Sequence, residues 1–356
     1  MKNKFIILIG LLLAMTVILS GCAAGLTASS WPGVTADAKN AYISGGSYVY
    51  AVNLLTGAQT WRYPDKASAN PFDATPALTS DGQLIVGGFD KKLYSLNPQT
   101  GQSIWQFTDA RDRWIGGVLV TDNMIYAPNA DYNLYALNLQ GKLQWTFQAD
   151  QSLWGAPVSD GTNIYIGTLG SKVYAVNAQS GKQVWLKKLD GAVLGSPVIG
   201  TDKTLYVGTY GGTIYAMNTA TGAAKSLTTT EKTTANWIWS GPALDGNSLY
   251  FGDGNGSLYA YPVGGTGQPW KQSLNGAIIG TPLVTTDTIV IGTEAGNVYY
   301  VDKTGKNPRP FAVAGKIYSS PVAAGNLVLI APTGGTATLV ALDQSGTVKW
   351  SFIPAK

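Results

Sequence analysis

The sequence contains no histidine and only one cysteine among its 356 residues. The missing histidine excludes Ser-His-Asp triads, histidine-ligated metals and imidazole acid–base chemistry. The single cysteine, Cys22, excludes an intramolecular disulfide. Charged residues make up 12% of the chain, and 24 basic residues are diluted among 20 acidic ones, so no basic face for nucleic acid is expected.

Glycine and aromatic residues are abundant instead. The chain has 44 glycines, 11 tryptophans and 19 tyrosines, and 45% of its residues are apolar. This apolar content can bury a large core, which argues against disorder. Many glycines and rings with little charge indicate an all-β chain of many short strands joined by tight turns.

The N-terminus has the pattern of an export signal. Lys2 and Lys4 precede an apolar run over residues 5–19, which is short for a membrane-spanning helix. The run ends in Leu19-Ser-Gly-Cys22, which resembles the bacterial lipobox, whose cysteine is acylated and becomes the new N-terminus. We therefore expect a signal peptide over residues 1–21, lipid attachment at Cys22 and a small, polar tether over residues 22–30.

The remaining chain, residues 31–356, repeats one unit eight times. A phrase such as Lys172-Val-Tyr-Ala-Val-Asn177 recurs, followed by a glycine and usually, four residues later, a tryptophan. Ser226 and Arg309 stand at the tryptophan position in repeats five and seven. From Trp61 to Trp350 the chain advances 289 residues in seven steps, or about 41 residues per repeat. The tryptophans of the other repeats are Trp61, Trp105, Trp145, Trp185, Trp270 and Trp350.

Each repeat contains four short runs rich in Val, Ile and Tyr, with turn residues between them. Four strands at a period near 40 residues are typical of a β-propeller blade. The sequence therefore predicts one eight-bladed β-propeller of four-stranded antiparallel blades. The eighth repeat has its own outer strand near residues 350–352, and a closing strand over residues 29–34 is an open alternative.

The pattern Ala-x-Asn-x-x-Thr-Gly-x-x-x-Trp, intact from Ala51 to Trp61, resembles the tryptophan-docking repeat of PQQ-like, or quinoprotein-like, propellers. The resemblance implies that each such tryptophan stacks between neighbouring blades. A lipoprotein with eight of these blades is similar to outer-membrane-protein assembly lipoproteins of the BamB type. The same fold also carries quinoprotein dehydrogenases, so the fold alone does not settle the function.

The carboxylates show little sign of catalysis. Most of them recur at one turn position, where Asp binds nearby backbone amides, or lie in links between blades. No acid–base pair, calcium loop or metal site stands out, and no cofactor is expected. Members of the quinoprotein dehydrogenase family have longer chains, typically with a vicinal disulfide and calcium ligands. We find no counterpart of the disulfide or of these ligands in this sequence. A PQQ-dependent dehydrogenase is therefore the least favoured function, and we expect no enzyme.

Bulky residues recur three positions before the first-strand proline, or its equivalent, and small residues recur one position before it. Both sets lie on one strand face, which lines the propeller axis. We infer a partial aromatic collar at one channel mouth, flanked by Phe72, Arg111, Arg113 and Trp237. The alternative is that these rings pack as core beneath the interblade links. Six of the seven residues at the first position are bulky, namely Trp114, Trp154, Leu194, Trp239, Ile279 and Tyr318, and the seventh is Asp73; the small set is Thr75, Gly116, Ala156, Ser196, Gly241, Thr281 and Ser320.

Trp, Tyr and Arg are enriched in interface hot spots, so the collar favours a protein-binding scaffold. By resemblance its partner is a membrane-embedded assembly machine, and the propeller itself is expected to be a monomer. The alternative is a glycan or small molecule held against the rings in the channel. If the host has an outer membrane, Ala23 after the cysteine resembles the signal for delivery to its periplasmic face. In a host with a single membrane, we expect the outer face of the cell membrane.

Overall fold

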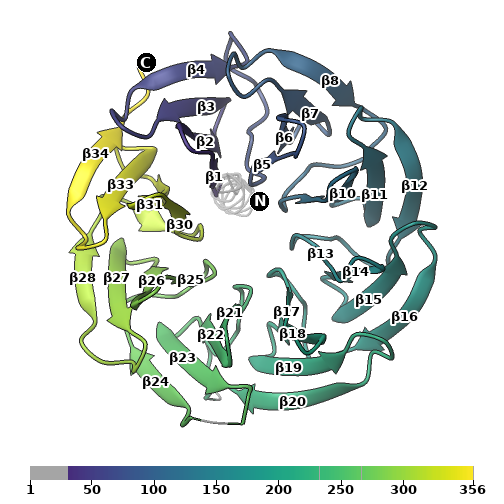
Figure 1. The fold of residues 1–356 in the computed structure, drawn as a ribbon, viewed down its shortest axis with the longest axis vertical. Helices are drawn as coiled ribbons and strands as arrows, with labels where there is room; N and C mark the ends of the chain where they lie inside the picture. The colour runs from purple at the N-terminus through teal and green to yellow at the C-terminus, as the bar shows by residue number, and fades with distance from the viewer. Residues whose placement is uncertain (1–30, 232, 266, 356) are drawn as a thin grey trace, which may run out of the picture. The chain divides into compact units, whose positions relative to one another are not determined.

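The strands pair in sequence order into radial sheets. The computed structural model describes residues 31–231, 233–265 and 267–355. Within them, eight four-stranded antiparallel sheets follow one another around a ring, as the colour gradient of Figure 1 shows. The sequence-based prediction of an eight-bladed β-propeller is confirmed. The same residues contain no helix that is long and apolar enough to cross a membrane.

Every blade consists of four strands that run consecutively outwards from the axis. The first four blades comprise β1 (Gly33–Ala36), β2 (Asn40–Gly45), β3 (Tyr48–Asn53) and β4 (Gln59–Tyr63); β5 (Ala77–Leu78), β6 (Leu84–Gly87), β7 (Leu93–Leu96) and β8 (Ser103–Phe107); β9 (Leu119–Val120), β10 (Met124–Pro128), β11 (Asn133–Asn138) and β12 (Leu143–Gln148); and β13 (Val158–Ser159), β14 (Asn163–Gly167), β15 (Lys172–Asn177) and β16 (Gln183–Lys188).

The last four blades follow the same order. They comprise β17 (Val198–Ile199), β18 (Thr204–Gly208), β19 (Thr213–Asn218) and β20 (Ala224–Thr229); β21 (Ala243–Asp245), β22 (Ser248–Gly252), β23 (Ser257–Pro262) and β24 (Trp270–Ser273); β25 (Leu283–Val284), β26 (Thr288–Gly292), β27 (Asn297–Asp302) and β28 (Arg309–Ala312); and β30 (Val322–Ala324), β31 (Leu327–Ile330), β33 (Leu339–Asp343) and β34 (Val348–Phe352), with a short pair, β29 (Lys316–Ile317) and β32 (Pro332–Thr333), beside blade 8.

The hydrophobic core is divided among the interfaces between blades. One cluster, for example, joins Ile85 and Leu93 of blade 2 to Ile125 and Leu137 of blade 3. Equivalent clusters lie between every other pair of neighbours, including blades 8 and 1. Alternating side chains on each strand therefore bury both faces of a blade, one against each neighbour.

Small residues allow the inner strands to crowd around the axis. A Cβ atom on Gly116 would lie 2.3 Å from the carbonyl oxygen of Trp154 in the next blade. The Ser196 hydroxyl accepts a 3.0 Å hydrogen bond from the backbone N–H of Ala156. Bulkier residues at these positions would push neighbouring blades apart.

The tryptophans of the repeat lie between blades. Each ring lies against the turn glycine of the next blade, as Trp185 does against Gly222, and its Nε1 donates to a carbonyl oxygen in that blade. The donor–acceptor pairs are Trp61–Pro98 (2.8 Å), Trp105–Leu139 (3.0 Å), Trp145–Ala178 (3.1 Å), Trp185–Thr219 (2.8 Å), Trp270–Lys303 (3.2 Å) and Trp350–Leu54 (2.8 Å).

The ring closes through side chains. Blade 8 is completed by its own outer strand, β34, and β1 is the inner strand of blade 1. The closing strand considered at residues 29–34 therefore adds no strand to blade 8. Trp350 instead donates to Leu54 of blade 1, and Val34 packs with Phe352 in one core cluster.

Blades 5 and 7 depart from the tryptophan pattern in different ways. In blade 7, Arg309 stands at the expected position, and the ring of Phe311 fills the space against Gly346. In blade 5 a bulge between Ile214 and Tyr215 shifts the register, so that Lys225 lies opposite the repeat alanine Ala216. Ser226, the residue that the repeat spacing assigns to the tryptophan position, therefore lies one residue from the structural equivalent, Lys225.

Candidate interaction site

The start of each inner strand forms one equivalent position at the channel mouth. Thr35 pairs with Tyr42 as Val158 pairs with Tyr165, which makes Trp31 the equivalent of Trp154. Trp239 and Tyr318 hold the same position in blades 6 and 8. All four rings are partly exposed. The inner strands thus deliver aromatic side chains from blades 1, 4, 6 and 8 to one place.

These rings meet one another across the axis. The ring centroids of Trp31 and Trp239 are 5.0 Å apart with the planes near perpendicular, and those of Trp31 and Tyr318 are 5.4 Å apart and stacked. Trp154 lies 6.3 Å from Trp239. Such offset and edge-on arrangements are the favoured geometries of aromatic pairs. Contacts between distant blades hold the rings in place.

Two further rings extend this group outwards. Trp237 and Tyr210 stack with centroids 5.9 Å apart and planes 2° from parallel, and both lie edge-on to Trp239. Tyr210 is 45% exposed at the tip of the β18–β19 hairpin. We call these six residues the collar cluster: Trp31, Trp154, Tyr210, Trp237, Trp239 and Tyr318.

A carboxylate lies at the edge of the collar cluster. Glu294 accepts hydrogen bonds from Lys316 Nζ at 2.7 Å and from the Tyr318 hydroxyl at 3.2 Å. The bond from Lys316 is the main cause that holds the pKa of Glu294 below its usual value, so the carboxylate is ionised at neutral pH. The ion pair fixes the orientation of Tyr318 within the cluster.

Two residues expected in or beside the collar are buried instead. Trp114 is 0% exposed and Phe72 is 2% exposed, and they occupy the position just before the collar position. Blade 3 lacks the first-strand proline, and the register of Leu119 opposite Tyr126 makes Ile115 the true equivalent of Trp154. The prediction for Trp114 was therefore wrong by one residue. The equivalent buried side chains elsewhere are Leu153, Val193, Ile238, Ile278 and Ile317.

Arg111 and Arg113 are exposed on the link before blade 3. The backbone N–H of Arg111 donates to Asp131 at 2.8 Å, and the Arg113 guanidinium lies 5.1 Å from the ring centroid of Phe89. These contacts place both arginines beside the hairpins of blades 2 and 3. The structure does not join them to the collar cluster through any ring contact among the residues described.

Sequence reasoning missed Trp31 and Tyr210. Trp31 stands four residues before Thr35, the same offset that separates Trp154 from Val158, so extending the repeat frame into blade 1 would have found it. Tyr210 lies in a hairpin that recurs in every blade, but the residue type at its position varies, with Leu169, Gly254 and Glu294 in other blades. Cys22 and the tether lie outside the residues that the structure describes.

Carboxylates near the inner mouth are occupied by structural hydrogen bonds. Asp131 accepts from the Tyr135 hydroxyl at 2.7 Å, and Asp253 accepts from the Tyr259 hydroxyl at 2.9 Å. Burial, and then the bonded aspartate, raises the pKa of each of these tyrosines. Among the described residues, no group of three or more acidic or cysteine side chains is arranged to hold a metal ion.

Comparison with known proteins shows the family to which the chain is related. The family model described as outer membrane protein assembly factor BamB matches residues 45–153, 149–261 and 227–308, which together cover more than half of the chain. BamB of Yersinia pestis is 25% identical over 311 residues, which make up 81% of this chain and 78% of that protein.

Other matches are shorter or concern the fold alone. The tetrathionate hydrolase of Acidithiobacillus ferrooxidans is 26% identical over 138 residues, covering 31% of this chain and 28% of that enzyme. The first relatives matched are covered over 25–30% of their own length. The crystal structure of BamB from Moraxella catarrhalis has a TM-score of 0.70 at 16% identity, with 86% of this chain and 92% of that chain covered, which shows the same fold.

Proposed function

We propose that this chain, which belongs to the family of the outer membrane protein assembly factor BamB, is a non-catalytic scaffold that binds a protein partner through the collar cluster. The observation that carries this proposal is the group of six rings gathered at one channel mouth, all of them at least partly exposed. Exposed apolar patches on soluble domains mark interaction sites, and Trp and Tyr dominate interface hot spots.

The rigidity of the collar cluster supports binding. Trp239 contacts Trp31, Trp154, Tyr210 and Trp237, so its indole is held by rings from three other segments and by one ring of its own link. A side chain that is already ordered loses little rotamer entropy when a partner covers it. The propeller therefore offers a preformed aromatic face.

We further propose that the chain is anchored in a membrane through acylated Cys22. Because Trp31 belongs to the collar cluster, the segment from Cys22 to Trp31 would attach the anchor beside the collar. Nine residues span at most about 30 Å when fully extended. The collar would therefore work close to the membrane, on the periplasmic face of the outer membrane in a host with two membranes, where an envelope assembly complex is the expected partner.

The occupied carboxylates support a role without catalysis. A general base must be free to take a proton, whereas Asp131 and Asp253 each accept several hydrogen bonds, from their own hairpins and, for Asp131, also from Arg111. Adding PQQ and calcium to the purified protein is expected to change neither its melting temperature nor dye reduction. A thermal shift accompanied by dye reduction would support an enzyme instead.

Recovery of partners from detergent-solubilised membranes tests the collar. We expect the double variant Trp154→Ala/Trp239→Ala to lose partner recovery, because it removes the centre of the ring group. Leu55→Ala is a matched control, because Leu55 is 89% exposed on the β3–β4 turn, away from the collar. Unchanged recovery by a folded double variant would show that the partner binds elsewhere.

A further inference from the structure

At the interface between blades 5 and 6, the outer strand of blade 5 lacks the aromatic side chains that outer strands contribute at other interfaces. In blade 3, two residues of the outer strand face the next blade: Trp145, opposite Ala136, and Phe147, opposite Leu134. The corresponding residues of blade 5 are Lys225, opposite Ala216, and Thr228, opposite Ile214. Both aromatic rings are therefore missing from β20.

The other blades keep at least one of the two rings. Blades 4 and 6 have a lysine and a glutamine at the Thr228 position but retain Trp185 and Trp270. Blade 7 lacks the tryptophan but retains Phe311. Among the residues described, blade 5 is the one blade without either. The residues at the Thr228 position are Tyr63, Phe107, Phe147, Lys187, Gln272, Phe311 and Phe352.

In four of the five blades with a ring at this position, the ring packs against the third-strand tyrosine of the next blade. The exception is Phe311 of blade 7, which faces a third strand without tyrosine and packs against Tyr300 of its own blade. The Phe147 ring lies 5.2 Å from that of Tyr174, edge to face. The same near-perpendicular geometry recurs in Phe107–Tyr135 at 5.3 Å and Tyr63–Tyr94 at 5.6 Å between ring centroids. In blade 6 the equivalent tyrosine, Tyr259, is partly exposed, whereas Tyr174 is buried.

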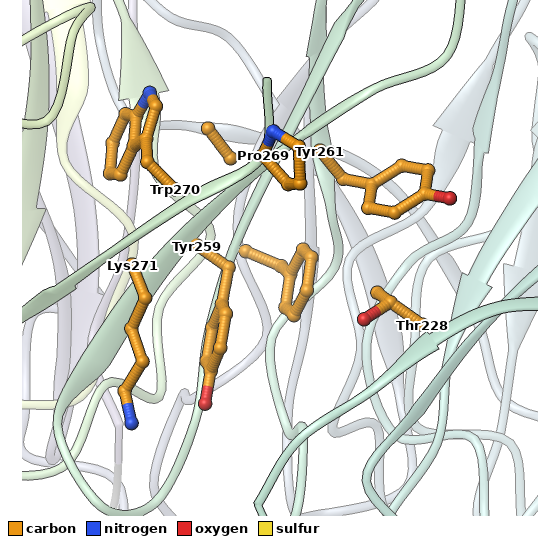
Figure 2. Close-up of a pocket in the computed structure, with 8 residues that line it drawn as sticks. Thr228, Tyr259, Tyr261, Pro269, Trp270 and Lys271 are labelled. Carbon is orange, nitrogen blue, oxygen red and sulfur yellow. The ribbon is translucent and has the colours of Figure 1, made fainter.

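A cavity of about 200 Å³ lies where these rings are missing. Figure 2 shows Tyr261 and Thr228 on one side of the cavity, with Tyr259 and Lys271 side by side on the other. Phe251 stacks on Tyr259 at 4.9 Å. Lys271 Nζ is held by Glu231 at 2.7 Å and lies 5.9 Å from the Tyr259 ring centroid. The cavity is lined by Thr228, Phe251, Tyr259, Ala260, Tyr261, Pro269, Trp270 and Lys271.

We propose that this cavity, the β20–β24 pocket, binds one aromatic side chain of a partner polypeptide. Its volume suits a single ring, because a cavity of about 150 Å³ in another protein holds benzene, whereas pockets for drug-sized ligands start near 300 Å³. The entering ring takes the place that Phe147 holds in blade 3, edge-on to Tyr259. The Lys271 cation lies beside it and favours the face of an aromatic ring over an aliphatic group.

This pocket is separate from the collar cluster, because outer strands line it and inner-strand starts carry the collar. It therefore adds a second contact point at the rim of the ring. A partner segment with one aromatic residue would complete the interface with its own ring. The pocket can be tested on the purified protein, without the partner that the collar binds.

The test titrates N-acetyl-L-phenylalaninamide, with N-acetyl-L-leucinamide as the aliphatic probe, by ligand-observed NMR. We expect the aromatic probe to bind with a Kd on the order of millimolar and the leucine probe severalfold more weakly, since aromatic pairing adds a modest preference. Thr228→Phe should fill the pocket, abolish binding and raise the melting temperature. Thr229→Phe, on the exposed side of the same strand, should change neither.

Several results would overturn the proposal. One is equal binding of the two probes, and another is aromatic binding that persists in Thr228→Phe. Loss of probe binding in the folded Trp154→Ala/Trp239→Ala variant would place the probe at the collar instead. Should Thr228→Phe not fold, Thr228→Leu fills less of the pocket and is expected to weaken probe binding severalfold.

Discussion

Two consecutive interfaces of the ring are built differently. Between blades 4 and 5, Trp185 is buried, donates to Thr219 at 2.8 Å and lies against Gly222. The Tyr165 ring lies 5.7 Å from it, and its hydroxyl reaches the same carbonyl at 3.2 Å. The Trp185 ring, its glycine and its carbonyl partner therefore add to the buried cluster that holds this joint together.

Between blades 5 and 6, the same strand positions hold Lys225 and Thr228, and a cavity remains. The buried cluster at this joint is Tyr206, Ile214, Ile238, Leu249 and Phe251, the smallest of the eight. The fold nevertheless continues through it without a break in strand order. The docking tryptophan thus stabilises a joint, whereas the strand pattern alone sets the fold.

Removing the tryptophan from the filled joint should have the largest effect. Trp185→Ala leaves a cavity and removes one of the two hydrogen bonds to the Thr219 carbonyl, and is expected to lower the free energy of unfolding by about 3–5 kcal/mol. Lys225→Ala, at the same register in blade 5, should change it by no more than about 0.5 kcal/mol. Urea unfolding, analysed with one m-value for both variants, measures the two changes in the free energy of unfolding. Equal losses would contradict the distinction between the two joints.

Two turn glycines separate backbone strain from contact with the docked ring. Gly222 has φ +70° and Gly265 has φ +79°, so alanine is strained at either. A Cβ on Gly222 would also lie 2.7 Å from the Trp185 ring, whereas nothing lies within 4 Å of one on Gly265. Gly265→Ala should cost about 1 kcal/mol of unfolding free energy, and Gly222→Ala at least about 2 kcal/mol. Thermal unfolding of the pair measures the difference, and similar shifts would mean that the ring moves aside freely.

Loss of one hydroxyl at the filled joint should have a smaller effect. Tyr165→Phe removes bonds to Asp160 at 2.7 Å and to Thr219, and should cost about 1 kcal/mol at pH 7. Tyr206→Phe, at the same place in blade 5, should cost less. Chemical denaturation of both variants checks the order, and a larger loss for Tyr206→Phe would reverse it.

The smallest effect is the pH dependence of the Tyr165→Phe loss. Burial raises the pKa of Asp160, but hydrogen bonds from Asn163, Tyr165 and Thr162 outweigh burial and leave the pKa below its usual value. The ionised carboxylate therefore stabilises the fold above the unfolded-state pKa, and this contribution is lost as pH falls through the folded-state pKa. The gap between wild type and Tyr165→Phe should narrow at about pH 2.5. A gap that stays the same in acid would assign the loss to the Thr219 bond alone.

Much of the ring could be predicted because the repeated residues are those that form turns and short strands. The spacing from Trp61 to Trp350 was enough for eight blades. A glycine four residues before the tryptophan marks the turn that the tryptophan of the preceding blade contacts in four blades, those of Trp61, Trp105, Trp145 and Trp185. Trp154, Trp239 and Tyr318 lie together in the structure, as their shared position before the first strand suggested.

The remaining features depend on register and on contacts across the ring. Because blade 3 has no first-strand proline, the repeat frame was misplaced there by one residue, and Trp114 was assigned to the position that Ile115 holds. Side chains alternate along a strand, so this shift exchanged a collar position for a buried one. The sequence did not reveal the position of the bulge in β20, which shifts the register of that strand. The meeting of Trp31 and Tyr210 with Trp239 joins blades that are distant in the chain, and local spacing contains no information about it.

The side-chain closure of the ring has a topological consequence. Because β1 and β34 belong to complete neighbouring blades, no sheet is shared between the first and last strands. The seam is the same kind of joint as the five other tryptophan joints, with Trp350 against Gly57 and bonded to Leu54. A circular permutant that links the two ends and opens another interblade connection would therefore keep every sheet intact. The order of the blades along the chain can therefore be permuted without changing the blades themselves.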